Sequence, residues 1–188
     1  MALAAEKPVF TRDTFLAWED AQTCRDVRHE FWQGEVFAMT GARQSHVLVA
    51  GNCYAALKQQ LRGGPCRAYI ADMAVEIASA DAILYPDVVI SCHPDDLRAA
   101  RTLQHPKVVI EILSDSTAAY DRGKKFAAYR SLSDLQEYIL IDPDSRTLEI
   151  YRRTPGNDWL LALNDSTRAL VLRSLGVEIG LELVFEDV

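Results

Sequence analysis

The sequence lacks any long apolar run, internal repeat, low-complexity tract or linker. No apolar segment of about 18 residues is present, which excludes a transmembrane helix. The start MALAAEKPVF has charged residues before any apolar run and no signal-peptide core. We therefore expect a cytoplasmic protein with no membrane partner, folded as a single domain over residues 1–188.

Cysteine is also scarce. The four cysteines, Cys24, Cys53, Cys66 and Cys92, form no CxxC pair and no Cys/His zinc spacing, which argues against a zinc site. Nothing resembles a disulfide-dense pattern, so we expect reduced, mostly buried thiols in a reducing compartment.

Positive charge is not in excess. The formal net charge is −7, whereas proteins that coat nucleic acid non-specifically present a dominant basic face. A local basic groove beside an acidic site remains compatible with this charge. The hydrophobic share of 49 % is enough for one full core.

What is present is a mixture of helical and strand patterns, which predicts an α+β fold. Apolar spacings of three and four predict helices at 11–20, 44–62 and 116–130. A hairpin around Gln33-Gly34 is expected at 29–39, followed by short strands at 66–77 and a strand in ILYPDVVIS. EYILID, TLEIYRR, WLLAL and ALVLRS, separated by turn signals, predict an antiparallel C-terminal meander that extends the sheet.

The stretch KVVIEIL places Glu111 inside an apolar strand. A buried carboxylate costs several kcal/mol unless a partner offsets its charge. Asp87 begins the apolar run VVIS after Pro86, and if the two strands are neighbours both acids can converge. Two converging carboxylates without soft ligands favour Mg²⁺ or Mn²⁺. The alternative is that Asp87 caps a strand end and Glu111 pairs with a lysine or arginine.

The Pro-Asp pair occurs twice more, at Pro94-Asp95 and Pro143-Asp144, where the settings predict only turns. His93 and His105 fall in the polar segment between the two strands and receive no role.

The segments YPDVVIS, VVIEILSDST, DRGKKFAAYR and EYILID together resemble the PD-(D/E)XK, restriction-endonuclease-like superfamily, and most closely its Uma-two family of endonucleases. The resemblance covers nearly the whole chain. It implies an α/β/α-like core, with a mixed sheet flanked by helices. It also implies an endonuclease that uses a divalent metal ion to hydrolyse phosphodiester bonds of nucleic acid, most simply DNA.

By this motif, Asp87 and Glu111 are the catalytic and metal-binding acids. The motif lysine should stand two residues after the second acid, on the same strand face, but Leu113 stands there. The resemblance implies that Lys125, on the following helix, takes over its role. Lys124 faces about 100 degrees away on an ideal helix and is expected to be solvated.

Further candidates extend this site. The resemblance implies that an acid from the N-terminal part, Glu30, joins the metal shell, and Asp72 and His46 are additional candidates. Basic residues that bracket the site could bind phosphates, although dispersed surface charge explains them equally well. These residues are Arg98, Arg101, Lys107, Arg122, Lys124 and Arg130.

A homodimer would provide one active site for each DNA strand. The sequence leaves two other hypotheses open. One is a catalytically degenerate protein of this fold that binds nucleic acid or a protein partner. Leu113 supports this hypothesis because it stands where the motif lysine is expected. The other is an interaction domain in which the acids only form salt bridges.

Overall fold

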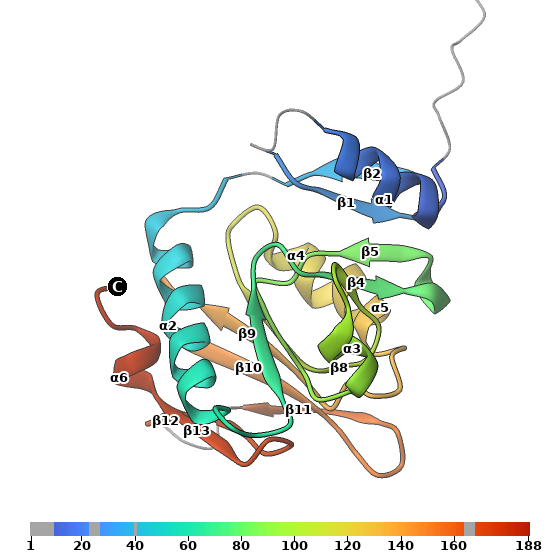
Figure 1. Ribbon diagram of the computed structural model, residues 1–188. Helices are drawn as coiled ribbons and strands as arrows, with labels where there is room; N and C mark the ends of the chain where they lie inside the picture. Colours follow the sequence, from blue (N-terminus) through green and yellow to red (C-terminus); the bar gives the residue numbers. More distant parts are fainter. Residues whose placement is uncertain (1–9, 23–26, 40, 164–167) are drawn as a thin grey trace, which may run out of the picture.

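A six-stranded mixed sheet forms the centre of the computed structural model, which describes residues 10–22, 27–39, 41–163 and 168–188 (Figure 1). The strand order is β11-β10-β9-β8-β6-β3. β8 and β9 are parallel, and the other neighbouring strands are antiparallel. The strands are β3 (Arg67–Ile70), β6 (Val88–Ser91), β8 (Pro106–Ile112), β9 (Glu137–Asp142), β10 (Thr147–Arg153) and β11 (Trp159–Leu163).

One face of this sheet is covered by α2 (Gln44–Gln60), α6 (Leu181–Val184) and the hairpin of β12 (Ala169–Leu172) and β13 (Val177–Gly180). Because side chains alternate along a strand, every second apolar residue of β6 and β8 points toward these elements. The residues on this face are Val88, Ile90, Val108, Ile110 and Ile112.

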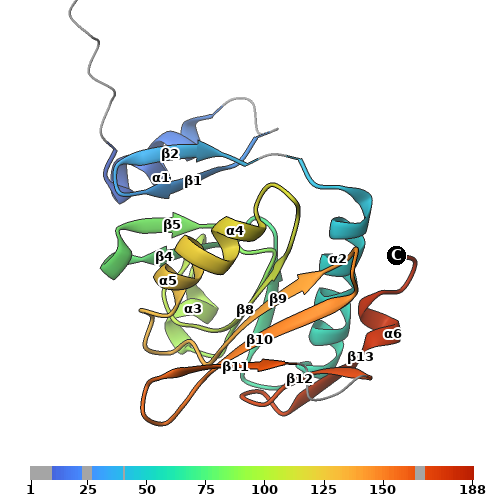
Figure 2. The same cartoon turned by 180° about the vertical axis from the view of Figure 1, so that it is seen from behind.

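The opposite face packs against a second sheet and a helical crossover (Figures 1 and 2). The second sheet has the order β2-β1-β5-β4-β7. Its strands are β1 (His29–Trp32), β2 (Glu35–Ala38), β4 (Ala74–Ile77), β5 (Ala82–Leu84) and β7 (Thr102–Leu103). The β1–β2 hairpin turns at Gln33 and Gly34, both with positive φ, as the sequence predicted. The 3₁₀ turn η1 (Ala78–Ala80) links β4 to β5.

The crossover from β8 to its parallel neighbour β9 is helical, as the connection between parallel strands requires. It consists of α4 (Ala118–Tyr120), the π-helical turn η2 (Asp121–Lys125) and α5 (Phe126–Tyr129). α1 (Arg12–Ala21) begins at Thr11, whose hydroxyl accepts a hydrogen bond from the backbone of Thr14. The mixed sheet with helices on its faces confirms the α+β, α/β/α-like fold class.

Pro86 divides the predicted strand ILYPDVVIS into two. Proline has no backbone N–H and interrupts a strand ladder, so the chain leaves the second sheet after β5 and enters the central sheet at β6. Asp87 lies at this crossing, immediately before Val88.

Three sequence expectations were wrong. ALVLRS does not extend the central sheet: β12 pairs with β13 in a separate hairpin, because Leu170, Leu172 and Ile179 bury their side chains against the α2 side of the core. Of the expected reduced thiols, only Cys53 is free and buried among the described residues.

Cys66 and Cys92 form a disulfide. They directly flank the paired residues Arg67 and Ser91 of β3 and β6, so the antiparallel register places them opposite each other. Cys24 lies outside the described residues, as does the turn at 164–166. Pro94-Asp95 is not a plain turn either: it opens the short helix α3 (Pro94–Arg98), where Pro94 needs no hydrogen-bond partner for its nitrogen.

No helix in the described part of the chain is both long and apolar enough to cross a bilayer.

Candidate metal centre and active site

Asp87 and Glu111 meet where β6 and β8 run side by side. The antiparallel register pairs Val88 with Ile110 and therefore sets Asp87 opposite Glu111. The Asp87 backbone N–H points at Glu111 Oε2, 3.4 Å away, and Asp87 Oδ2 accepts a 2.7 Å hydrogen bond from the backbone N–H of Ile112. The convergence that the sequence predicted is therefore present.

Glu111 points to the face of the sheet that the crossover covers. By alternation it shares this face with Val109 and Leu113, which pack against α5 and the second sheet. Only 2 % of Glu111 is exposed, so its partner must come from the elements packed above it.

Lys125 is that partner. Its Nζ lies 3.0 Å from Glu111 Oε1, 3.3 Å from Glu30 Oε1 and 3.8 Å from Asp121 Oδ1, and only 7 % of its side chain is exposed. Lys125 ends the π-helical turn, and such turns are frequent at functional sites. The ammonium group thus reaches Glu111 from the crossover, while Leu113 is buried in the apolar cluster.

The cluster carries an excess of negative charge. Glu30, Asp87, Glu111 and Asp121 surround a single lysine, and Glu111 Oε1 has no partner in hydrogen-bond geometry among the described residues. Burial raises the pKa of Glu111 well above its ordinary value; the charge of Lys125 opposes this rise, and the carboxylates of Asp87, Asp121 and Glu30 add to it. Burial likewise raises the pKa of Asp121.

Lys125 stays protonated in this setting. Burial alone would lower its pKa, but the charges of Glu111, Glu30 and Asp121 outweigh burial and raise it well above the ordinary value. The side chain is therefore a fixed positive charge and is poorly suited to accept a proton.

His46 lies in the first turn of α2, with Nε2 3.2 Å from Asp87 Oδ2. Burial alone would lower the pKa of His46, but its hydrogen bond to Asp87 and the charge of that carboxylate raise it. The imidazole can thus orient Asp87 and carry a proton beside it.

The three additional candidates have different positions. Glu30, from β1, enters the cluster and accepts a hydrogen bond from the backbone of Tyr85, and His46 reaches Asp87. Asp72 does not line the cavity: it is exposed and forms a 3.0 Å ion pair with Arg28.

Three of the six proposed phosphate-binding residues form ion pairs with acids. Arg98 pairs with Asp95, Arg101 with Asp20 and Arg122 with Glu149. Of the six proposed residues, the exposed Lys124 alone lines the cavity. The structure therefore does not assemble Arg98, Arg101 and Arg122 into a basic surface at the site.

Sequence reasoning missed two contributors. It gave Asp121 no role in the site, although the spacing of four residues places it beside Lys125 on a helix. It also missed Arg43, which lines the cavity and pairs with Asp115 at 3.0 Å. No local pattern marks Arg43, because its partner is distant in sequence.

The cluster lies at the floor of a cavity of about 600 Å³. The walls come from β1, β2, the start of α2, the segment after β8 and the crossover. Residues that matter for the chemistry are Glu30, His46, Asp87, Glu111, Asp121 and Lys125.

The donor set fits a hard divalent cation. Carboxylate oxygens are the ligands that Mg²⁺ prefers. A cation would offset the excess negative charge and would coordinate Glu111 Oε1, which has an ion-pair contact with Lys125 but no hydrogen-bond partner among the described residues. Asp87 and Glu111 are the residues that would hold it.

Comparison with known proteins places this site in a family. The family model Uma2, described as "Putative restriction endonuclease", matches residues 12–186. The chain belongs to the Uma2 family. The pair of acids on adjoining strands and the lysine beside the second acid lie within the matched residues.

Two relatives come from Synechocystis sp. (strain ATCC 27184 / PCC 6803 / Kazusa). The uncharacterized protein slr1290 is 29 % identical over 182 residues, covering 97 % of this chain and 94 % of the relative. The uncharacterized protein sll1609 is 29 % identical over 163 residues, covering 86 % and 90 %.

A solved structure resembles the Uma2 chain in fold. It is the crystal structure of "a putative nuclease belonging to DUF820" from Anabaena variabilis ATCC 29413, with a TM-score of 0.74 and 18 % identity. The match covers 94 % of this chain and 97 % of that one. At this identity the likeness establishes the fold.

Glu111→Gln should stabilise the protein when EDTA has removed metal. A carboxyl group whose pKa is raised on folding binds its proton more tightly in the folded state, so stability falls as pH rises from the ordinary glutamate range toward the raised pKa. Glutamine removes this loss, and Lys125 keeps Glu30 and Asp121 as partners.

We expect the melting temperature of Glu111→Gln at neutral pH to exceed that of wild type by a few degrees, about 2–4 °C per kcal/mol for a chain of this size. The difference should shrink in acid, where both proteins carry a neutral group at this position. Thermal melts over a pH series check this, and a variant that melts lower than wild type at neutral pH would refute it.

Proposed function

We propose that the protein is a Mg²⁺- or Mn²⁺-dependent endonuclease that hydrolyses phosphodiester bonds of DNA. The observation that carries the proposal is the convergence of Asp87, Glu111 and Lys125 at the floor of one cavity, within a chain of the Uma2 family. A bound divalent ion would polarise the phosphate and lower the pKa of the attacking water.

The side chains of the cavity have separate roles in the proposed reaction. Asp87 and Glu111 would hold the ion, Glu30 orients Lys125, and His46 orients Asp87. The Lys125 ammonium stabilises negative charge that develops on the phosphate oxygens. Its raised pKa supports this role rather than that of a general base. Lys124, exposed at the cavity, is placed to attract the DNA backbone.

A homodimer belongs to the proposal because cutting both strands requires two such sites. The edge strand β11 supports it, since Leu160 and Leu161 are 62 % and 49 % exposed there, and exposed apolar edges favour pairing. Light scattering should give about twice the chain mass of 21.0 kDa. A monomer at assay concentrations would refute the homodimer but not the nuclease activity.

A plasmid-nicking assay tests the activity. With Mg²⁺ or Mn²⁺, supercoiled DNA should be converted to nicked or linear forms, and EDTA should abolish conversion. Cleavage should weaken as salt rises, because cations compete for the phosphates. RNA of matched length serves as the comparison substrate, and preferential cleavage of RNA would refute the assignment to DNA.

Absence of cleavage with either ion would refute the nuclease. The remaining hypothesis would then be a catalytically degenerate nucleic-acid or protein binding module, which a gel-shift titration with the same DNA can detect.

A further inference from the structure

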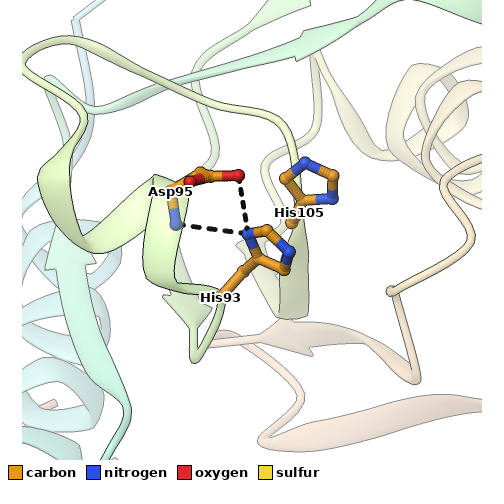
Figure 3. Close-up of side chains that lie close together, drawn as sticks. All are labelled: His93, Asp95 and His105. Carbon is orange, nitrogen blue, oxygen red and sulfur yellow. Dashed lines mark hydrogen bonds and ion pairs between the residues drawn. The ribbon is translucent and has the colours of Figure 1, made fainter.

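A second group of metal-ligating side chains lies at the other end of β6 and β8. It consists of His93, Asp95 and His105, each offering one ligand atom within 4.8 Å of the others (Figure 3). His93 and His105 line a cavity of about 470 Å³, together with Lys107 and Asp134. Two imidazoles and a carboxylate are a donor set unlike that of the Asp87–Glu111 site.

Buried groups hold the two histidines in place. The fully buried Ser91 hydroxyl donates to the backbone carbonyl of His105 at 3.0 Å and accepts from the backbone N–H of His93 at 3.2 Å. The buried carboxylate of Asp96 accepts from the backbone N–H groups of Gln104 and His105. Both backbones are thus fixed relative to each other, as a preorganised site requires.

The two imidazole rings have different hydrogen-bond partners. His105 Nδ1 lies 2.8 Å from Asp134 Oδ2, and a carboxylate there fixes the tautomer that leaves Nε2 with a free lone pair. His93 Nδ1 accepts a long, 3.3 Å hydrogen bond from the backbone N–H of Asp95 as the N-cap of α3, so metal binding through this nitrogen would replace that hydrogen bond. Figure 3 shows both rings and the Asp95 carboxylate close together.

The two rings stack, with centroids 4.0 Å apart and planes 23° apart. Imidazole with one carboxylate is a donor set for Zn²⁺ and similar transition metals and a poor one for Mg²⁺.

We propose that His93, Asp95 and His105 form a transition-metal site, with Zn²⁺ as the expected ion, and that Asp134 orients His105. Three protein donors leave one tetrahedral position for water. Because His93 follows β6 and His105 precedes β8, the ion would join the ends of the two strands farthest from Asp87 and Glu111. The proposal therefore does not depend on the nuclease function.

The charged residues near His93, Asp95 and His105 are compatible with a bound cation. Arg98 pairs with Asp95 Oδ1, but this pair is exposed and weak, and Asp95 Oδ2 faces His93. Zinc–ligand bonds of about 2.0–2.1 Å require the donors to approach more closely. The exposed Asp95 side chain can make this movement by rotation. Lys107 adds one positive charge to the cavity, against the negative charge of Asp134.

Calorimetric titration with Zn²⁺ tests the site, using tag-free protein that carries Asp87→Ala so that the other metal site is disabled. We expect one Zn²⁺ per chain, unaffected by excess Mg²⁺. Adding His105→Gln should weaken binding at least 100-fold, and adding Asp134→Asn should weaken it about 10- to 100-fold. Adding His46→Gln, the matched histidine control in the catalytic cavity, should leave binding unchanged.

Co²⁺ absorption gives an independent readout, since the visible bands of a nitrogen-ligated ion should disappear with His105→Gln. Melting curves in EDTA check that the variants fold. The proposal is overturned if wild type and Asp87→Ala bind no Zn²⁺. It is equally overturned if His105→Gln binds as tightly as its parent, or if His46→Gln is the change that abolishes binding.

Discussion

A Lys125→Met protein should cut DNA about 10²- to 10³-fold more slowly than wild type at saturating Mg²⁺, the loss typical of removing one charge-stabilising donor from an active site. Lys125 is the cation that reaches the acid pair: its Nζ lies 3.0 Å from Glu111. Methionine keeps the length of the side chain and removes only its charge.

Lys124→Met is the matched control, because the neighbouring lysine is exposed and contacts the substrate only through its charge in our account. We expect it to weaken DNA binding slightly and to leave the maximal cutting rate nearly unchanged. Equal losses of cutting rate in the two variants would contradict a specific role for Lys125 beside the acid pair.

Lys125→Met should also destabilise the metal-free protein. Removing one partner of a buried ion pair costs about 3–5 kcal/mol, and Glu30, Glu111 and Asp121 would be left without their cation. The double variant Glu30→Gln/Lys125→Met should recover part of this stability without recovering cleavage. Recovered cleavage in the double variant would show that the single variant lost activity through unfolding.

Asp87→Asn should abolish most of the activity with little effect on folding. Asparagine is nearly isosteric, and its carbonyl can still accept the hydrogen bond that Ile112 donates to Asp87. A metal ion contributes several kcal/mol to transition-state stabilisation, which corresponds to roughly 10³-fold or more in rate. Single-turnover nicking rates at several Mg²⁺ concentrations measure the loss.

Asp72→Asn is the control for Asp87→Asn, since Asp72 is an exposed aspartate paired with Arg28. We expect its activity to match wild type. The pKa of His46 should fall toward its ordinary value in Asp87→Asn, because the carboxylate that raises it is gone. An NMR titration of the imidazole can detect this change, and an unchanged pKa would contradict the contact.

The acid pair could be predicted because it depends on local patterns. Apolar runs set both strands, and a carboxylate inside one of them demands a partner. The topology then determines which element contacts Glu111. A crossover between parallel strands must cover one face of the sheet, and Glu111 lies on that face. The motif resemblance, rather than the spacing, singled out Lys125.

Pairings between distant segments could not be predicted in the same way. The disulfide of Cys66 and Cys92 depends on the register of β3 against β6. The neutralisation of Arg101 by Asp20 joins residues far apart in the chain. His93 and His105 looked like loop residues because the buried Ser91 that links them gives no sequence signal.

Calorimetric titration of Mg²⁺ and Mn²⁺ into wild type and Asp87→Asn tests the central claim most directly. We expect saturable binding to wild type and its loss in the variant, with both proteins equally folded. Absence of binding to wild type would contradict it, and Lys125 would then be the permanent partner of Glu111 rather than a neighbour of the metal.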